Sequence, residues 1–240
     1  MKRLIITCLV SISLFSSCRM LSGRNVRGDG NVVSQTRSFR DFNAVDVSGG
    51  IKVFITADSN YSVRVETDQN LQEFIEVYSE GKTLRIKNAS NTDIDATGDI
   101  KVYVSAPMFE RFNASGACSI NTTSRIASSG TIDVELSGAS SINGDLKAPK
   151  ITVHLTGACN AELIGETKDL SIDGTGASTI KAFGLLAENV DVDLTGAGDA
   201  EVYASVKLDA DATGAASVHY KGTAAVTSDV SGAGAVKKVD

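Results

Sequence analysis

Residues 132–140, IDVELSGAS, combine two patterns that recur through the second half of the chain. The first is strict alternation of apolar and polar residues, which is typical of a β-strand with one buried face. The second is a tetrad of a hydroxyl residue, Gly, Ala and a small or polar residue, in which the glycine permits a sharp corner. The tetrad begins at Ser115, Ser137, Thr156, Thr175, Thr195, Thr213 and Ser231.

The spacing of the tetrads is that of a solenoid. Their glycines, Gly116, Gly138, Gly157, Gly176, Gly196, Gly214 and Gly232, are separated by steps of 22, 19, 19, 20, 18 and 18 residues. A propeller blade needs roughly 40 residues, which is too long for this repeat. The pattern therefore predicts an all-β fold, a right-handed parallel β-helix with about 18–20 residues per coil. A single coil buries too little apolar surface to offset the conformational entropy that its backbone loses on ordering, so the coils must stack with their glycine corners aligned.

The first residues have the features of a secretory signal. Lys2 and Arg3 precede an uncharged apolar stretch, residues 4–15, that is too short to span a bilayer. The sequence LFSSC at residues 14–18 resembles a bacterial lipobox, which implies lipidation of Cys18 and firm membrane anchoring. We expect a lipoprotein signal peptide over residues 1–17, then lipidated Cys18 and a flexible tether over residues 18–38. No acidic run resembling a surface-export signal follows Cys18, which favours the periplasmic side of the outer membrane.

Residues 39–112 form a different kind of β region, with alternating strands and most of the aromatic residues. A short helix is expected over residues 70–78. Because the terminal units of a solenoid must seal its core, we expect this region to cap the β-helix repeats of residues 113–240. Thr97-Gly98 stands 18 residues before Gly116 and is predicted to be the corner of the junction coil.

Three features together resemble the head GIN domain family, which is named for the head of an auto-transporter adhesin. They are FNAVDVSGGIKV at residues 42–53, VYVSAP at residues 102–107, and the serial hydroxyl-Gly-Ala coils. The resemblance runs from about residue 30 to the C-terminus. It implies a β-helical envelope protein, frequently a lipoprotein of Bacteroidetes-type bacteria, and it carries over no catalytic residue.

Alignment of the coils on the glycine predicts an acidic row three positions before it. The row contains Asp95, Asn113, Glu135, His154, Asp173, Asp193, Asp211 and Asp229. Like charges about 4.8 Å apart repel, and a fully wet face tolerates this repulsion. A partly shielded face would instead bind Ca²⁺, which would raise the melting temperature.

A second predicted row lies one position before the glycine and is entirely hydroxylic. It contains Thr97, Ser115, Ser137, Thr156, Thr175, Thr195, Thr213 and Ser231. Cross-strand hydroxyl bonding explains such a row structurally. The functional alternative is a flat polar surface that binds glycan or protein. Its candidate residues are Thr175, Thr195 and Thr213 with Asp173, Asp193, Asp211 and Asp229.

Cys118 and Cys159 occupy equivalent places two coils apart. Their separation of about 9–10 Å along the stack exceeds what a disulfide spans, so we expect free, half-buried thiols. No Cys/His spacing typical of a metal site is present in the sequence, and we expect neither metal nor cofactor.

Composition bears on the choice between binding and catalysis. A lyase-like β-helix enzyme acting on polysaccharide is the alternative, but the sequence has no Trp, no Arg after Arg125, and two isolated histidines, His154 and His219. The net charge of −6 disfavours nucleic acid as a partner. We predict a non-catalytic cell-envelope lipoprotein, a β-helical scaffold or adhesin-like module for glycan or protein, that contacts the membrane through its lipid. The open edge of the last coil, residues 226–236, also predicts a homo-oligomer.

Overall fold

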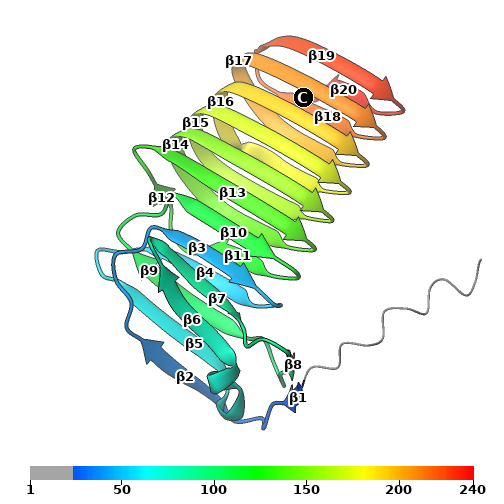
Figure 1. Ribbon diagram of the computed structural model, residues 1–240. Helices are drawn as coiled ribbons and strands as arrows, with labels where there is room; N and C mark the ends of the chain where they lie inside the picture. The colour runs from blue at the N-terminus through cyan, green and yellow to red at the C-terminus, as the bar shows by residue number, and fades with distance from the viewer. Residues whose placement is uncertain (1–23) are drawn as a thin grey trace, which may run out of the picture.

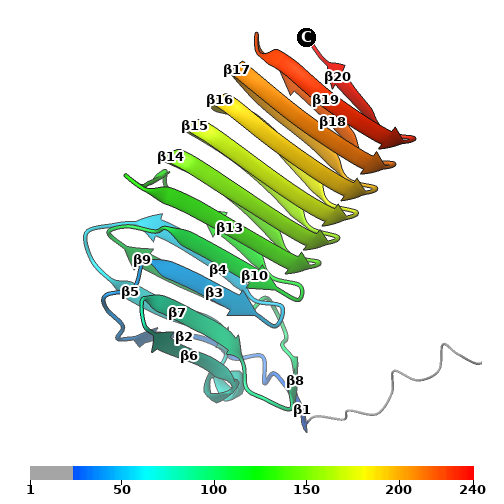
Figure 2. The same cartoon turned by 45° about the horizontal axis from the view of Figure 1, so that its top comes forward.

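The structure is a computed structural model that describes residues 24–240 (Figure 1). From residue 131 onward the chain winds as a stack of parallel coils (Figures 1 and 2). The strands are β13 (Thr131–Gly138), β14 (Ser141–Gly157), β15 (Asn160–Gly176), β16 (Thr179–Gly196), β17 (Asp199–Gly214), β18 (Ser217–Lys221), β19 (Ala225–Gly232) and β20 (Ala235–Lys238). The predicted all-β parallel β-helix is confirmed, while its right-handed winding stays a prediction.

The glycine corners are aligned as the repeat predicts. Gly138, Gly157, Gly176, Gly196, Gly214 and Gly232 are register partners in turn. Each corner requires glycine for two reasons, and Gly176 illustrates both. Its φ is 111°, and a Cβ atom there would lie 2.5 Å from the carbonyl oxygen of Gly157. That oxygen instead accepts a hydrogen bond from the Ala177 N–H at 2.8 Å, so the corners are bonded to one another along the stack.

The core lies inside the coils and follows the two-residue alternation. In β14 the side chains of Ile151, Val153 and Leu155 are buried, while Thr152 and His154 between them point outward. The same inward positions are filled by aliphatic or small residues in β13 to β17, so the apolar side chains stack into one continuous core.

The junction coil is not the one that the spacing predicts. It is formed by β3 (Ala44–Ser48) and β4 (Lys52–Ala57), which pair in parallel with β10 (Arg111–Ser115) and β11 (Ser119–Thr122). Ser48 is the register partner of Ser115, so the adjacent corner is Ser48-Gly49, and the Thr97-Gly98 prediction is wrong. The reason is topological, because residues 58–109 leave the stack and return on the far side of β3 and β4. There β7 (Thr83–Asn88) and β9 (Lys101–Ala106) pair with them.

Antiparallel strands lie at this N-terminal end of the stack (Figures 1 and 2). β5 (Ser62–Asp68) pairs antiparallel with β9 and with β2 (Val32–Arg37), and β6 (Ile75–Glu80) pairs antiparallel with β7. The helix predicted over residues 70–78 is wrong in its second half. A 3-10 turn, η2, covers Gln69–Phe74, and the alternating residues that follow pair as β6. Whether these strands cap the core functionally stays a prediction.

The flexible tether predicted over residues 18–38 is wrong for the part that the structure describes. β1 (Arg24–Arg27) pairs with β8 (Thr92–Asp95), and β2 pairs with β5. The buried carboxylate of Asp68 fixes this segment, since it accepts bonds from the Gly30 N–H and from the N–H and hydroxyl of Thr97 at 2.6–2.9 Å. The predicted signal peptide and Cys18 lie outside the described residues. Within residues 24–240, no helix is long and apolar enough to cross a membrane.

Candidate functional site

The predicted acidic row exists as a straight line of outward side chains on β13 to β19. Glu135, His154, Asp173, Asp193, Asp211 and Asp229 are consecutive register partners. At the N-terminal end the row continues through Asn113 to Asp46, not to Asp95. Asp95 was misplaced for the same topological reason as Thr97-Gly98, and it pairs with Arg27 in the sheet of β1 and β8.

Asp173, Asp193, Asp211 and Asp229 are all exposed, in keeping with the solvated interpretation of the row. His154 faces Asp173 with Nδ1 and Oδ2 3.8 Å apart. Among residues 24–240, no three Asp, Glu, His or Cys side chains are grouped to hold a metal ion. The carboxylates lie side by side on adjacent rungs. The effect of Ca²⁺ on the melting temperature stays a prediction.

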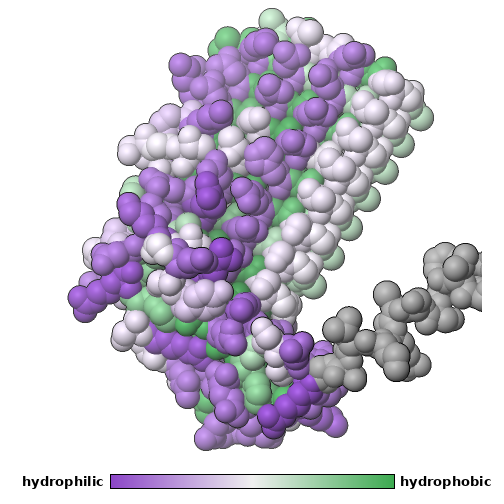
Figure 3. Space-filling view, viewed as in Figure 1, coloured by the Kyte–Doolittle hydropathy of each residue, from purple (hydrophilic) through white to green (hydrophobic). Residues whose placement is uncertain are grey.

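The hydroxyl row forms one edge of the stack. Ser137, Thr156, Thr175, Thr195, Thr213 and Ser231 are register partners, and Ser48 takes the place predicted for Thr97. With the glycines and the exposed alanines that follow them, they make a pale strip of small residues along the stack (Figure 3). Within the described residues no side-chain hydrogen bond joins Thr175, Thr195 and Thr213. The cross-strand hydroxyl bonding expected for the row is therefore not what aligns it, and the backbone bonds of the corner do so.

Cys118 and Cys159, the two cysteines among residues 24–240, are free, and both are buried more deeply than expected, at 2% and 0% exposure. They belong to an inward row directly after the corner. The Sγ of Cys159 lies 3.6 Å from the Thr156 carbonyl oxygen, and the Ser140 hydroxyl in the same row donates to the Ser137 carbonyl at 3.0 Å. Burial raises the pKa of the Cys118 thiol. These thiols therefore fill the corner and do not face a ligand.

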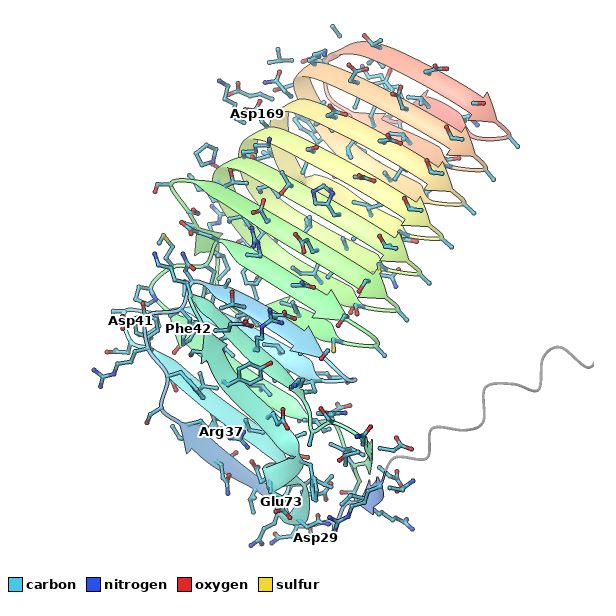
Figure 4. All side chains as sticks on the ribbon, in the orientation of Figure 1. Asp29, Arg37, Asp41, Phe42, Glu73 and Asp169 are labelled. Atoms are coloured by element: carbon cyan, nitrogen blue, oxygen red, sulfur yellow. The ribbon has the colours of Figure 1, made fainter. Side chains whose placement is uncertain are left out.

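A groove that the sequence analysis missed lies at a second corner, where β14 to β17 bend between their two straight halves. The alternation breaks there, because two outward residues follow one another at 149–150 and at 206–207. The register also shifts between β16 and β17 on either side of Ala187. The hollow has a volume of about 650 Å³ and reaches from Ser128 to Ser205. Asp169, next to Lys168 in its wall, marks this corner in Figure 4.

The signal for the groove was present in the sequence but weak. Each coil carries two adjacent outward residues near the middle of its long strand, such as Pro149-Lys150 and Val206-Lys207. Such a pair shows that the strand turns there, but the depth of the hollow depends on side-chain sizes in neighbouring coils. Three of the large apolar side chains that the fold leaves exposed, Ile164, Leu186 and Val206, lie in the coils of this corner.

A known protein family matches most of the chain. The family described as "Putative auto-transporter adhesin, head GIN domain" matches residues 41–224, most of the chain and all of its regular coils but the last. The protein belongs to the head GIN domain family. The resemblance inferred from residues 42–53 and from the hydroxyl-Gly-Ala coils is thereby confirmed. The matched range begins just before β3, whose Ser48-Gly49 corner starts the stack.

Solved structures share the fold of this head GIN domain. One described as a "putative adhesin" from Bacteroides fragilis NCTC 9343 has a TM-score of 0.84 at 19% identity, covering 89% of this chain and all of the other. Two come from Parabacteroides distasonis ATCC 8503. One, described as a "putative lipid binding protein", has a TM-score of 0.70 at 22% identity, and the other, described as a "putative adhesin", has a TM-score of 0.71 at 24% identity. Each covers 90% of this chain and all of the other. No curated protein matches the sequence.

Proposed function

We propose that this head GIN domain is a non-catalytic binding module, anchored in the cell envelope, that presents the sides of its β-helix to a glycan or protein. The observation that supports this most directly is the unbroken register of the coils over the strand that leads into each glycine corner. From Gly138 to Gly232 each coil sets its outward acidic and hydroxyl positions beside those of its neighbours on this wall. A partner with a repeating structure therefore meets repeating chemistry on a rigid wall, which limits the entropy lost on binding.

The adhesin descriptions of the family and of two solved relatives support a binding role. The two histidines support it as well. His154 precedes the glycine corner and faces Asp173, whereas His219 follows the corner and faces Asp199 with Nε2 and Oδ2 3.5 Å apart. The first pair is exposed and the second is half-buried, and each lies on its own wall, so the two do not converge on one substrate position.

We propose anchoring at the outer membrane through Cys18, on the periplasmic side. The lipobox-like LFSSC segment and the adhesin family support this location. Labelling of growing cells with radioactive palmitate tests it directly. The wild-type chain is expected to carry label and to sediment with the outer membrane, and Cys18→Ser is expected to lose both. A labelled Cys18→Ser chain would contradict the assignment.

Binding and catalysis are separated by presenting the purified full chain with envelope polysaccharides and envelope proteins. Retention of a polysaccharide or protein without chemical change is the expected result. New reducing or unsaturated sugar ends would show a lyase-like or hydrolytic enzyme and would overturn the proposal. Retention of nothing from the envelope would overturn it too.

A further inference from the structure

The groove at the second corner is built from three rows that run along the stack, across the strands. The outer wall consists of Lys147, Glu166, Leu186 and Tyr203, which are register partners in turn. The floor consists of Ala148, Thr167 and Ala187, also in register. The opposite wall contains Pro149, Lys168 and Glu188. From Ala127, the partner of Lys147, to Tyr203 the wall spans five rungs, or about 20 Å at the usual strand spacing.

The floor is low because its side chains are small and face the core. Ala148, Thr167 and Ala187 are 5%, 8% and 2% exposed. The Thr167 hydroxyl is already used, since it donates to the Asp169 carbonyl oxygen at 3.1 Å. An elongated molecule can therefore lie in the hollow, with its flat underside on methyl groups and backbone, and reach polar groups only at the two walls.

The charges of the groove cancel. The Glu166 carboxylate forms ion pairs with Lys147, with Nζ and Oε2 3.0 Å apart, and with Arg125, with Nη1 and Oε1 3.6 Å apart. On the opposite wall Lys168 and Glu188 are exposed, and neither forms an ion pair with any residue in the range 24–240. One ammonium and one carboxylate thus remain to exchange hydrogen bonds with a ligand. Because the charges of Lys168 and Glu188 sum to zero, the wall favours an uncharged ligand over an anionic one.

The C-terminal end of the groove is apolar. Leu186 is 50% exposed and lies beside Tyr203, which is half-buried. An aromatic ring with a polar tip, next to an exposed aliphatic side chain, suits a ligand that has both C–H faces and hydroxyl groups. Sugar rings have this mixture, and each ring of an extended β-linked chain adds a length close to one rung of the stack. Successive sugars would then each lie over one coil, although the side chains that they meet differ from rung to rung.

We propose that this groove binds an uncharged, linear, β-linked oligosaccharide lying parallel to the solenoid axis. Tyr203 and Leu186 contact the ring faces, and Lys168 and Glu188 bond the hydroxyl groups. This inference rests on the proposed binding function, for which it names the site and the class of ligand.

The test uses the full chain with immobilised hexasaccharides of cellulose, chitin, xylan and β-galactan types, followed by calorimetry with the best one. Tyr203→Ala is expected to weaken binding about tenfold, the effect of losing one well-packed aromatic contact. The double variant Lys168→Gln/Glu188→Gln is expected to weaken it by a similar factor. Tyr78→Ala is the matched control, since Tyr78 is exposed on β6 at the other end of the molecule, and it should bind as wild type does. Thermal melting of each variant confirms folding.

Three results would overturn the inference. One is unchanged affinity of both groove variants for the hexasaccharide. The others are a preference for hexagalacturonate, an anionic probe, and a preference for phosphatidylglycerol vesicles, a lipid surface. If the wild-type chain still retains another envelope glycan or protein, and the groove variants retain it equally, the binding function stands and only this site falls. If the wild-type chain retains nothing, both fall.

Discussion

The coils of residues 131–238 and the region of residues 24–109 share the same alternation of apolar and polar residues but pair their strands differently. In the coils every pairing is parallel, and the chain turns at a glycine corner of fixed position. In the N-terminal region a tight turn at Gly81 folds β6 back on β7, and β5 lies antiparallel to both β2 and β9. Alternation thus determines that a segment is a strand, whereas the connection determines its partner.

The two regions also differ in what fixes their backbone. In the coils it is the close approach of glycine to glycine along the stack. In the N-terminal region it is side-chain bonding to single buried groups, above all Asp68, and aromatic packing such as that of Phe42 against Tyr61 with ring centroids 5.1 Å apart. The glycine contacts of the coils are predictable because they repeat, whereas each side-chain contact of the N-terminal region occurs only once.

The largest effect is expected from Gly176→Ala. The new Cβ would lie 2.5 Å from the Gly157 carbonyl oxygen, at a φ of 111°, so both strain and overlap oppose folding. We expect a loss of about 3 kcal/mol in the free energy of unfolding, measured by urea denaturation. Gly98→Ala in the N-terminal region is the control, because a Cβ there meets nothing within 4 Å, and it should change stability little. Equal losses in the two variants would contradict the contrast between the regions.

A smaller loss, about 2 kcal/mol, is expected from Asp68→Asn, which replaces one of the two acceptor oxygens that hold Gly30 and Thr97. Burial raises the pKa of Asp68, but hydrogen bonds from Thr97 and Gly30 lower it by more, so the net effect is a lowered pKa. A lowered pKa in the folded state stabilises the protein above the ordinary value of 3.8, and this stabilisation is lost as pH falls through the folded pKa.

The difference between wild type and Asp68→Asn should therefore shrink as pH falls below about 4. Urea denaturation between pH 3 and 7 measures this, with amide exchange of Gly30 and Thr97 as the local readout. A difference that stays constant with pH would show that Asp68 acts by shape alone.

The smallest effect is expected from charge. Asp193 lies between Asp173 and Asp211 on neighbouring rungs, so Asp193→Asn should raise the free energy of unfolding by a few tenths of a kcal/mol at low salt. Salt screens this repulsion, so the gain should vanish near 1 M NaCl. In the N-terminal region Asp46 lies 2.8 Å from Arg85, and Asp46→Asn should destabilise instead. A shift of the same sign in both variants would contradict this reading of the acidic row.

Much of the fold could be predicted from the sequence because each coil repeats the same local chemistry. The positions of Gly138 to Gly232, the inward rows and the free cysteines follow from the spacing alone. The junction could not be predicted in this way, because Ser48-Gly49 and Ser115-Gly116 are neighbours in space with a long excursion between them in the chain. Spacing instead pointed to Thr97-Gly98, whose hydroxyl bonds Asp68.

The candidate surfaces were predictable in unequal measure. The rows of Asp173 and Thr175 follow from the same alignment as the corners, since outward residues at fixed distances from the glycine must stack. The bend at the groove left a weak signal in the sequence, but the depth of the groove was not predictable, because it depends on where β16 and β17 shift register and on the small size of Ala148 and Ala187. These are properties of the packed coils and not of one repeat.

Alignment of the coils is tested most directly by engineered disulfides in a chain carrying Cys118→Ser and Cys159→Ser. Thr175 and Thr195 are register partners on adjacent rungs, about 4.8 Å apart, within the Cα distance of about 4.4–6.8 Å that a disulfide spans. Thr175→Cys/Thr195→Cys is expected to cross-link under mild oxidation. Thr156→Cys/Thr195→Cys, two rungs apart, is expected to stay reduced. Cross-linking of the second pair, or failure of the first, would contradict a stack with its glycine corners in line.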